Sequence, residues 1–124
     1  MLDAYAWIEY LDGTSRGAEV RDKIEDPHNS CVTSAVTLAE VVSKFIRKGR
    51  DPKVALKALE DNSNVQAVDV TLARMAGEVH AEMRRRVADF GLADAFVLAT
   101  ARNKGFKVLT GDPHFKTLPE AVMI

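Results

Sequence analysis

The sequence predicts an α/β protein, a three-layer α/β/α sandwich around a central, mostly parallel sheet. Short apolar runs alternate with helical patterns, which is typical of βαβ units around a parallel sheet. The chain has 124 residues, of which 47% are hydrophobic, enough for one sizeable core. It contains no internal repeat and no linker rich in Pro, Gly or Ser. We therefore expect residues 1–124 to form a single domain.

The first half of the chain is expected to alternate short strands with helices. From Thr37 onward, apolar residues recur at i, i+3, i+4, i+7 and i+8, which is one face of a helix that ends at Gly49. Asp51 and Pro52 then supply a cap and a first-turn proline for another helix. In order, the expected elements are a strand at residues 1–2, helices at 4–11 and about 14–26, a strand at 30–34, and helices at 37–48 and 52–62.

The second half continues the alternation. A long helix ending near Val87 has an apolar stripe that would face inward. Residues 92–101 are apolar almost all round, which indicates a helix packed on several sides. The remaining expected elements are strands at residues 65–70, 106–110 and 121–124, with a turn at Gly111-Asp112-Pro113.

Charge and cysteine content exclude several classes of protein. The 17 Lys and Arg residues nearly balance 18 Asp and Glu, which argues against a generally cationic nucleic-acid binder but not against local charged pockets. No apolar run approaches the roughly 20 residues that cross a bilayer, and Asp3 and Glu9 do not suit a signal peptide. The lone Cys31 excludes a disulfide framework. We expect a soluble, cytoplasmic protein.

Four carboxylates stand out by their positions directly after predicted strands or at the starts of predicted helices. Ligand crevices of open parallel sheets lie beyond the carboxyl ends of the strands, so we expect at least three of these acids to converge. They are Asp3 after the first strand, Glu40 in the helix after the second, Asp94 in the apolar helix and Asp112 after the strand at 106–110. These four residues are called the acidic cluster below.

Each member also has a structural explanation. Asp3 would cap the first helix, Glu40 would complete a capping box with Thr37, and Asp112 before Pro113 suits a type I turn. Asp94 suits the amino end of a helix dipole. This explanation is weakest for Asp94, because its neighbours are apolar and an unpaired buried charge is costly.

Clustered carboxylates raise one another's pKa, and a hard divalent cation removes that conflict. Mg²⁺ and Mn²⁺ prefer oxygen ligands and are often held by a few carboxylates plus substrate phosphate. Such a site polarises a phosphodiester and lowers the pKa of a bound water for hydrolysis. The absence of Cys/His pairs argues against zinc.

The segments around these acids resemble the four motifs of the PIN domain, and their order and spacing are similar to those of the VapC-type toxins of prokaryotic toxin–antitoxin pairs. The resemblance spans essentially the whole chain. The segments are Asp3-Ala4-Tyr5-Ala6-Trp7-Ile8, Thr37-Leu38-Ala39-Glu40-Val41, Leu92-Ala93-Asp94-Ala95-Phe96-Val97-Leu98-Ala99-Thr100-Ala101 and Leu109-Thr110-Gly111-Asp112-Pro113-His114-Phe115.

The resemblance implies an endoribonuclease dependent on Mg²⁺ or Mn²⁺, whose catalytic and metal-binding acids are the acidic cluster, Asp3, Glu40, Asp94 and Asp112. It also implies that Thr110 supports the site by hydrogen bonding, that the protein is a homodimer, and that a VapB-like antitoxin occludes the cleft. Only Met1 and Leu2 precede Asp3, and Ala4 stands where relatives commonly carry Ser or Thr. The alternative is an inactive PIN-like module that binds protein or RNA.

Other residues have a structural and a functional interpretation. Basic residues at Lys44, Arg47 and Lys48 would form either a solvated helix face or a rim for RNA phosphates. We expect His80 to be a packed or interface histidine rather than a ligand. His114 is expected to be a turn residue, with contact to substrate as the alternative because it lies two residues after Asp112. The aromatic side chains Tyr5, Trp7 and Tyr10 are expected in core or dimer packing rather than in base stacking.

A phosphoacceptor receiver-like domain also gathers acids beyond its strands. It would need an Asp at the end of a central strand and a Lys after a late strand. Asp69 ends a strand candidate, but Lys104 and Lys107 lie before or within the late strand. The receiver pattern therefore fails.

Overall fold

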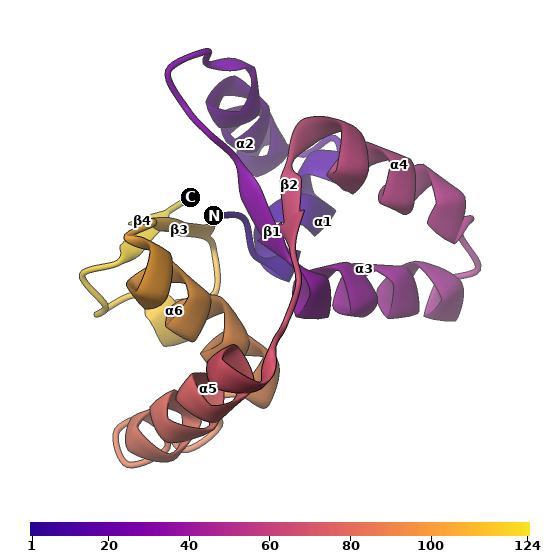
Figure 1. Cartoon of the computed structure of the whole chain (residues 1–124). Coiled ribbons are helices and arrows are strands. Elements are labelled where there is room, and N and C mark those ends of the chain that lie inside the picture. The colour runs from indigo at the N-terminus through magenta and orange to yellow at the C-terminus, as the bar shows by residue number, and fades with distance from the viewer.

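The computed structural model describes all 124 residues and contains a parallel sheet of very short strands (Figure 1). Strand β1 pairs with β2, and β3 pairs with β4. Leu2 joins the two pairs through parallel bridges to Thr33 and Leu109, so the order across the sheet is β2, β1, Leu2, β3, β4. The strands are β1 (Val32–Ser34), β2 (Asn64–Gln66), β3 (Val108–Thr110) and β4 (Ala121–Met123).

Helices connect these strands, and side chains cap the amino ends of most of them. The caps Asp3, Thr14, Ser34, Asp51 and Asp69 each accept a hydrogen bond from an amide of the first turn. The helices are α1 (Ala4–Asp12), α2 (Ser15–Glu25), α3 (Ala35–Arg47), α4 (Pro52–Asn62), α5 (Val70–Met83), α6 (Leu92–Lys104) and the 3₁₀ turn η1 (Pro113–Phe115). No helix has both the length and the apolar character needed to cross a bilayer.

Two hydrophobic clusters cover the two faces of the sheet. Consecutive residues of a strand point to opposite faces, so Met1 and Val108 pack with α6, whereas Leu2 and Leu109 pack with α1, α3 and α4. In Figure 1, α5 and α6 lie on the opposite side of the strands from α3 and α4. The predicted three-layer α/β/α architecture is therefore confirmed.

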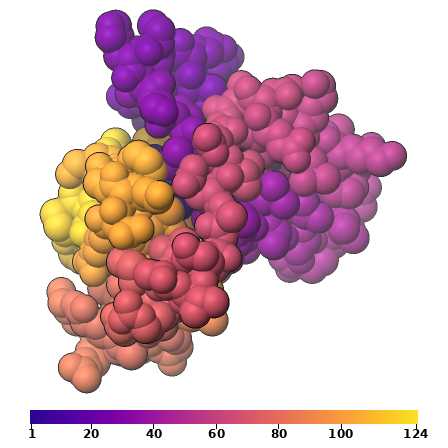
Figure 2. Space-filling model, in the orientation of Figure 1, coloured from indigo at the N-terminus to yellow at the C-terminus, as the bar shows by residue number.

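All strands are parallel, but the direction in which the chain adds strands to the sheet reverses at Leu2. The chain runs from Leu2 outward to β1 and β2, then crosses back to place β3 and β4 on the other side of Leu2. The crossing segment leaves β2 and runs along the surface between the lobe of α3 and α4 and the lobe of α5 and α6 (Figure 2). A reversal of this kind opens a crevice beyond the carboxyl ends of the two strands that flank it, here Leu2 and β3.

Several predicted boundaries are wrong for local reasons. Helix α3 begins at Ala35 because the Ser34 hydroxyl accepts a hydrogen bond from the Val36 amide at 3.1 Å. Thr37 is therefore inside the helix, and the expected capping box with Glu40 does not form.

The strand expected at residues 65–70 stops at Gln66, because Asp69 caps α5 instead. Helix α5 ends at Met83 rather than near Val87, and the chain turns between these two residues through Arg84, Arg85 and Arg86.

Candidate active site

The whole acidic cluster lines one pocket of about 410 Å³ at the carboxyl ends of the strands. Its members come from four separate parts of the chain. Asp3 directly follows Leu2, Glu40 lies on α3, Asp94 lies on α6, and Asp112 follows β3. The pocket thus occupies the crevice that the strand order predicts.

Asp3 is the most deeply buried acid, with 4% of its surface exposed. Its Oδ1 accepts a hydrogen bond from the Ala6 amide at 2.8 Å, and its Oδ2 accepts one from the Thr110 hydroxyl. Burial raises the pKa of Asp3 to about 7, and the charges of Asp112 and Asp94 act in the same direction. The hydrogen bonds from Ala6 and Thr110 oppose this increase only in part.

The Thr110 hydroxyl joins Asp3 to the turn that carries Asp112. Besides donating to Asp3, it accepts a hydrogen bond from the Asp112 amide at 2.9 Å. Thr110 is fully buried at the end of β3, so this link has a fixed position. The structure therefore gives Thr110 a supporting contact of the kind that the PIN resemblance implies.

Burial and mutual repulsion also raise the pKa of two other acids. For Asp94, burial is the main cause and the charge of Asp112 adds to it, while the Gly91 amide and His114 oppose it. For Glu40, partial burial in the pocket comes first, followed by the charges of Asp94 and Asp112, with Lys44 acting in the opposite direction. These shifts indicate a site in which several negative charges face one another without full compensation.

Asp94 and Asp112 also have the structural roles considered from the sequence. The Gly91 amide donates to Asp94 Oδ2 at 3.3 Å, which helps to begin α6. The His114 amide donates to Asp112 Oδ1 at 2.8 Å, which caps η1.

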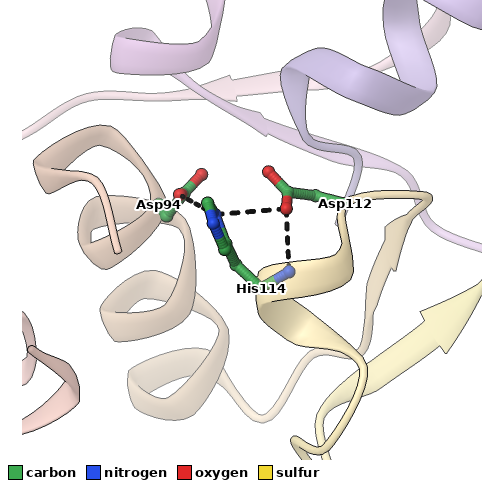
Figure 3. Close-up of side chains that lie close together, drawn as sticks. All are labelled: Asp94, Asp112 and His114. Atoms are coloured by element: carbon green, nitrogen blue, oxygen red, sulfur yellow. Dashed lines mark hydrogen bonds and ion pairs between the residues drawn. The ribbon is translucent and has the colours of Figure 1, made fainter. Parts of the chain in front are cut away.

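His114 extends the site beyond the residues predicted from the sequence. Figure 3 shows its ring between Asp94 and Asp112. The Nδ1 atom lies 3.2 Å from Asp112 Oδ1 and 3.6 Å from Asp94 Oδ2, while Nε2 lies 3.1 Å from Asp89 Oδ2. Burial lowers the pKa of His114, but the contact with Asp89 and the charges of Asp112, Asp89 and Asp94 outweigh it and leave the pKa raised.

His114 lies in the turn η1, as expected, and its ring in addition lies against two members of the acidic cluster. The ring faces Asp94 and Asp112 because η1 turns the chain back immediately after Asp112. The available signal was the spacing of His114, two residues after a predicted site acid, together with an acid at Asp89 shortly before α6.

Basic side chains from α3 stand at the edge of the same pocket. Lys44 and Arg47 line it, and neither forms an ion pair with a carboxylate. Lys48 is exposed at the end of α3 and does not line the pocket. Arg86 pairs with Glu82 at 2.8 Å, as the spacing of these two residues predicts.

The aromatic residues of α1 have different surroundings. Trp7 is fully buried and donates from Nε1 to the Thr33 hydroxyl at 3.0 Å, in agreement with core packing. Tyr5 is half-buried and lines the acidic pocket. Its hydroxyl accepts a hydrogen bond from Arg16. His80 is partly buried, with Nε2 3.1 Å from the Phe90 carbonyl oxygen, as expected of a packed histidine.

Comparisons with known proteins agree with this topology. Residues 1–121 match the family model of the PIN domain. No curated protein sequence matches the chain.

Solved structures with a similar fold include Mycobacterium tuberculosis VapC20, described as a sarcin-ricin loop cleaving toxin (20% identity, TM-score 0.77, covering 95% of this chain and 93% of that one). A DNA-bound VapBC from Salmonella typhimurium is 22% identical, with a TM-score of 0.75 and coverage of 100% and 95%. A toxin–antitoxin complex from Klebsiella pneumoniae is also 22% identical, with a TM-score of 0.69 and coverage of 98% and 94%.

Proposed function

Because this chain belongs to the PIN domain family, we propose that it is a metal-dependent endoribonuclease and the toxin of a type II toxin–antitoxin pair. The observation that carries the proposal is the convergence of the acidic cluster on one pocket from four separate segments of the chain. A site built only for folding has no need to hold like charges together, since their repulsion costs free energy.

The residues of this pocket fit a divalent cation. The pKa values of Asp3, Glu40 and Asp94 are raised, first by burial and further by the charges of neighbouring acids, so a bound cation would favour their ionised forms. The buried Nδ1 of His114 also has no hydrogen-bond partner. We assign the binding of Mg²⁺ or Mn²⁺ to the acidic cluster. A bound ion of this kind polarises a phosphodiester and lowers the pKa of a coordinated water.

The remaining pocket residues would position the substrate and the acids. Lys44 and Arg47 are free of carboxylate partners, so they are available to bind RNA phosphates beside the acidic cluster. Thr110 would hold Asp3 in place by donating to its Oδ2. Asp3 would keep a proton near neutral pH until a cation compensates its charge, because its pKa is about 7.

The partners are proposed from the structures of similar fold. Several of these are complexes described as toxin–antitoxin or VapBC assemblies. We propose that this chain forms a homodimer, that a VapB-like antitoxin covers its acidic pocket, and that it acts on RNA in the cytoplasm.

Replacement of a single acid tests the proposed reaction. Asp94→Asn preserves the size of the side chain and removes one negative charge from the pocket, so it should reduce Mg²⁺- or Mn²⁺-dependent cleavage of a structured RNA by at least 100-fold, as expected for loss of a group acting on the reacting centre. The thermal transition should remain cooperative. Asp61→Asn is the matched control, because Asp61 is exposed on α4 and pairs with Lys57 at 2.7 Å.

EDTA should inhibit the wild-type protein as strongly as the substitution does. Unchanged cleavage by Asp94→Asn would contradict the assignment of the acidic cluster. RNA binding by the wild-type chain with no metal-dependent cleavage would instead identify a PIN-like binding module.

A further inference from the structure

We propose that His114 is a direct ligand of the metal ion through Nδ1, that Asp89 orients its ring, and that the site consequently prefers Mn²⁺ to Mg²⁺. The inference rests on the proposed function, because it adds a nitrogen ligand to the same metal site. It assigns roles to two residues outside the acidic cluster.

The position of Nδ1 is that of a ligand atom. It is buried, has no hydrogen-bond partner, and lies 3.2 Å from Asp112 Oδ1 and 3.6 Å from Asp94 Oδ2. One ligand atom from each of these three residues lies within 4.8 Å of the others. Adjacent ligands of an octahedral ion with bonds of about 2.1 Å are roughly 3 Å apart, so the two distances from Nδ1 need only a small contraction around an ion, whereas the widest pair of the group needs a larger one.

Asp89 fixes the ring in the orientation that ligation requires. Its Oδ2 lies 3.1 Å from Nε2, whereas the other ring nitrogen, Nδ1, faces Asp94 and Asp112. Nδ1 can bind an ion only without a proton, so ion binding would displace to solvent the proton that Asp112 and Asp94 favour there, while Asp89 keeps the proton on Nε2. Metal-binding histidines commonly make this second contact to a carboxylate, which fixes the tautomer and strengthens the ligand.

The surrounding structure limits other positions of the ring. The Phe90 ring lies beside it with centroids 6.3 Å apart, and the His114 amide is held by Asp112 Oδ1 at 2.8 Å. The backbone amide and the imidazole ring of His114 therefore both lie against the acidic cluster. This arrangement is largely formed before an ion binds, which reduces the entropy lost on binding.

A nitrogen ligand changes which ion the site selects. Imidazole is a softer donor than carboxylate and suits transition-metal ions, whereas Mg²⁺ takes oxygen ligands and retains its waters. Oxygen ligands from the acidic cluster still accommodate Mn²⁺. His114 should therefore increase affinity for Mn²⁺ more than affinity for Mg²⁺.

Electron spin echo spectroscopy of bound Mn²⁺ tests ligation without reference to activity. The full-length wild-type chain with one equivalent of Mn²⁺ should show modulation from a coordinated ¹⁴N nucleus. Growth on ¹⁵N-histidine should change that modulation, and His114→Gln should abolish it. His28→Gln is the matched control, because His28 is an exposed histidine whose Nδ1 lies 3.0 Å from Asp26, and it should leave the signal intact.

Isothermal titration supplies the second measurement. His114→Gln should weaken Mn²⁺ binding by at least about 10-fold and Mg²⁺ binding by less, because loss of an outer partner alone typically costs roughly 10–100-fold. Asp89→Asn should weaken Mn²⁺ binding toward the lower end of that range, whereas Asp26→Asn should not change it.

Two outcomes would overturn the inference in different ways. Mn²⁺ binding without ¹⁴N modulation, or with modulation that survives His114→Gln, would exclude ligation by His114 and leave the proposed nuclease intact. Failure of the wild-type chain to bind Mn²⁺ at all would contradict both proposals. If His114→Gln does not fold, ¹⁵N-histidine labelling of His28→Gln and of His80→Gln still identifies the coordinated ring, since the chain has only 3 histidines.

Discussion

The buried charge of Asp3 should destabilise the metal-free protein at neutral and alkaline pH. Its pKa is about 7 in the folded chain, against an ordinary value of 3.8. The folded state therefore holds more protons than the unfolded state between these values, so the free energy of unfolding falls as pH rises through this window. Below about pH 4 the acid is protonated in both states and the cost disappears.

Asp3→Asn measures this cost, because asparagine is uncharged and caps a helix as well as aspartate does. An increase in pKa from 3.8 to about 7 corresponds to an upper bound of about 4 kcal/mol at roughly 1.4 kcal/mol per pH unit. In EDTA at pH 8, Asp3→Asn should therefore be more stable than the wild type. The difference in free energy of unfolding between Asp3→Asn and the wild type should increase by about 3 kcal/mol between pH 5 and pH 8, with most of the change below pH 7.

Urea denaturation at several pH values in EDTA provides the assay. Asp69→Asn is the matched control, because Asp69 caps α5 at an exposed position by accepting from the Leu72 amide at 2.8 Å. Measured alongside, it shows how much of the Asp3→Asn effect comes from replacing any capping aspartate and how much from the burial of Asp3. A wild-type minus Asp3→Asn difference that does not change with pH would refute the reasoning. Added Mn²⁺ should stabilise the wild type but not Asp3→Asn.

Three further substitutions test the contacts around the pocket. Thr110→Val should lower the free energy of unfolding, measured by urea denaturation, by about 1–3 kcal/mol, because the Asp112 amide loses its acceptor. Thr110→Ser keeps the hydroxyl and should retain most of the wild-type free energy of unfolding. Gly111→Ala would add a Cβ that clashes with the edge of the Tyr5 ring, so it should lower the free energy of unfolding, and Tyr5→Ala should relieve part of that loss. Additive effects in this double-mutant cycle would contradict the packing. Arg47→Gln should raise KM for RNA more than it lowers kcat, and it should make KM less dependent on salt concentration. A decrease in kcat as large as the decrease in kcat/KM would instead assign Arg47 to the chemical step.

The periodic and capped segments of this fold were predictable from sequence. The helix that begins at Pro52 has its cap and first-turn proline beside each other in the sequence, so a local signal is sufficient. The start of α3 was misplaced because two hydroxyl residues, Ser34 and Thr37, both suit a cap. Burial of Thr37 against the core decides between them, and burial depends on tertiary packing that the local sequence does not specify.

The convergence of the acids was predictable, because Asp3 and Asp112 directly follow strands. Glu40 and Asp94 lie near the amino ends of helices, and the sheet order brings all four segments to one pocket. The role of His114 was not predictable, because it depends on the direction in which η1 turns after Asp112. Its contact with Asp89 joins two segments on either side of α6. Neither segment contains a periodic pattern that would indicate the other.

The capping and functional interpretations of the acids, which are alternatives in the sequence, hold together in the structure. Oδ1 of Asp3, Oδ1 of Asp112 and Oδ2 of Asp94 each accept a hydrogen bond from a backbone amide. Each carboxylate is thereby held by one oxygen while its second oxygen is available to the pocket, although that of Asp3 also accepts from Thr110. Asparagine at these positions should keep the cap and remove the charge, whereas alanine should remove both. Comparison of the two substitutions therefore separates loss of the acidic site from loss of the helix ends that position it.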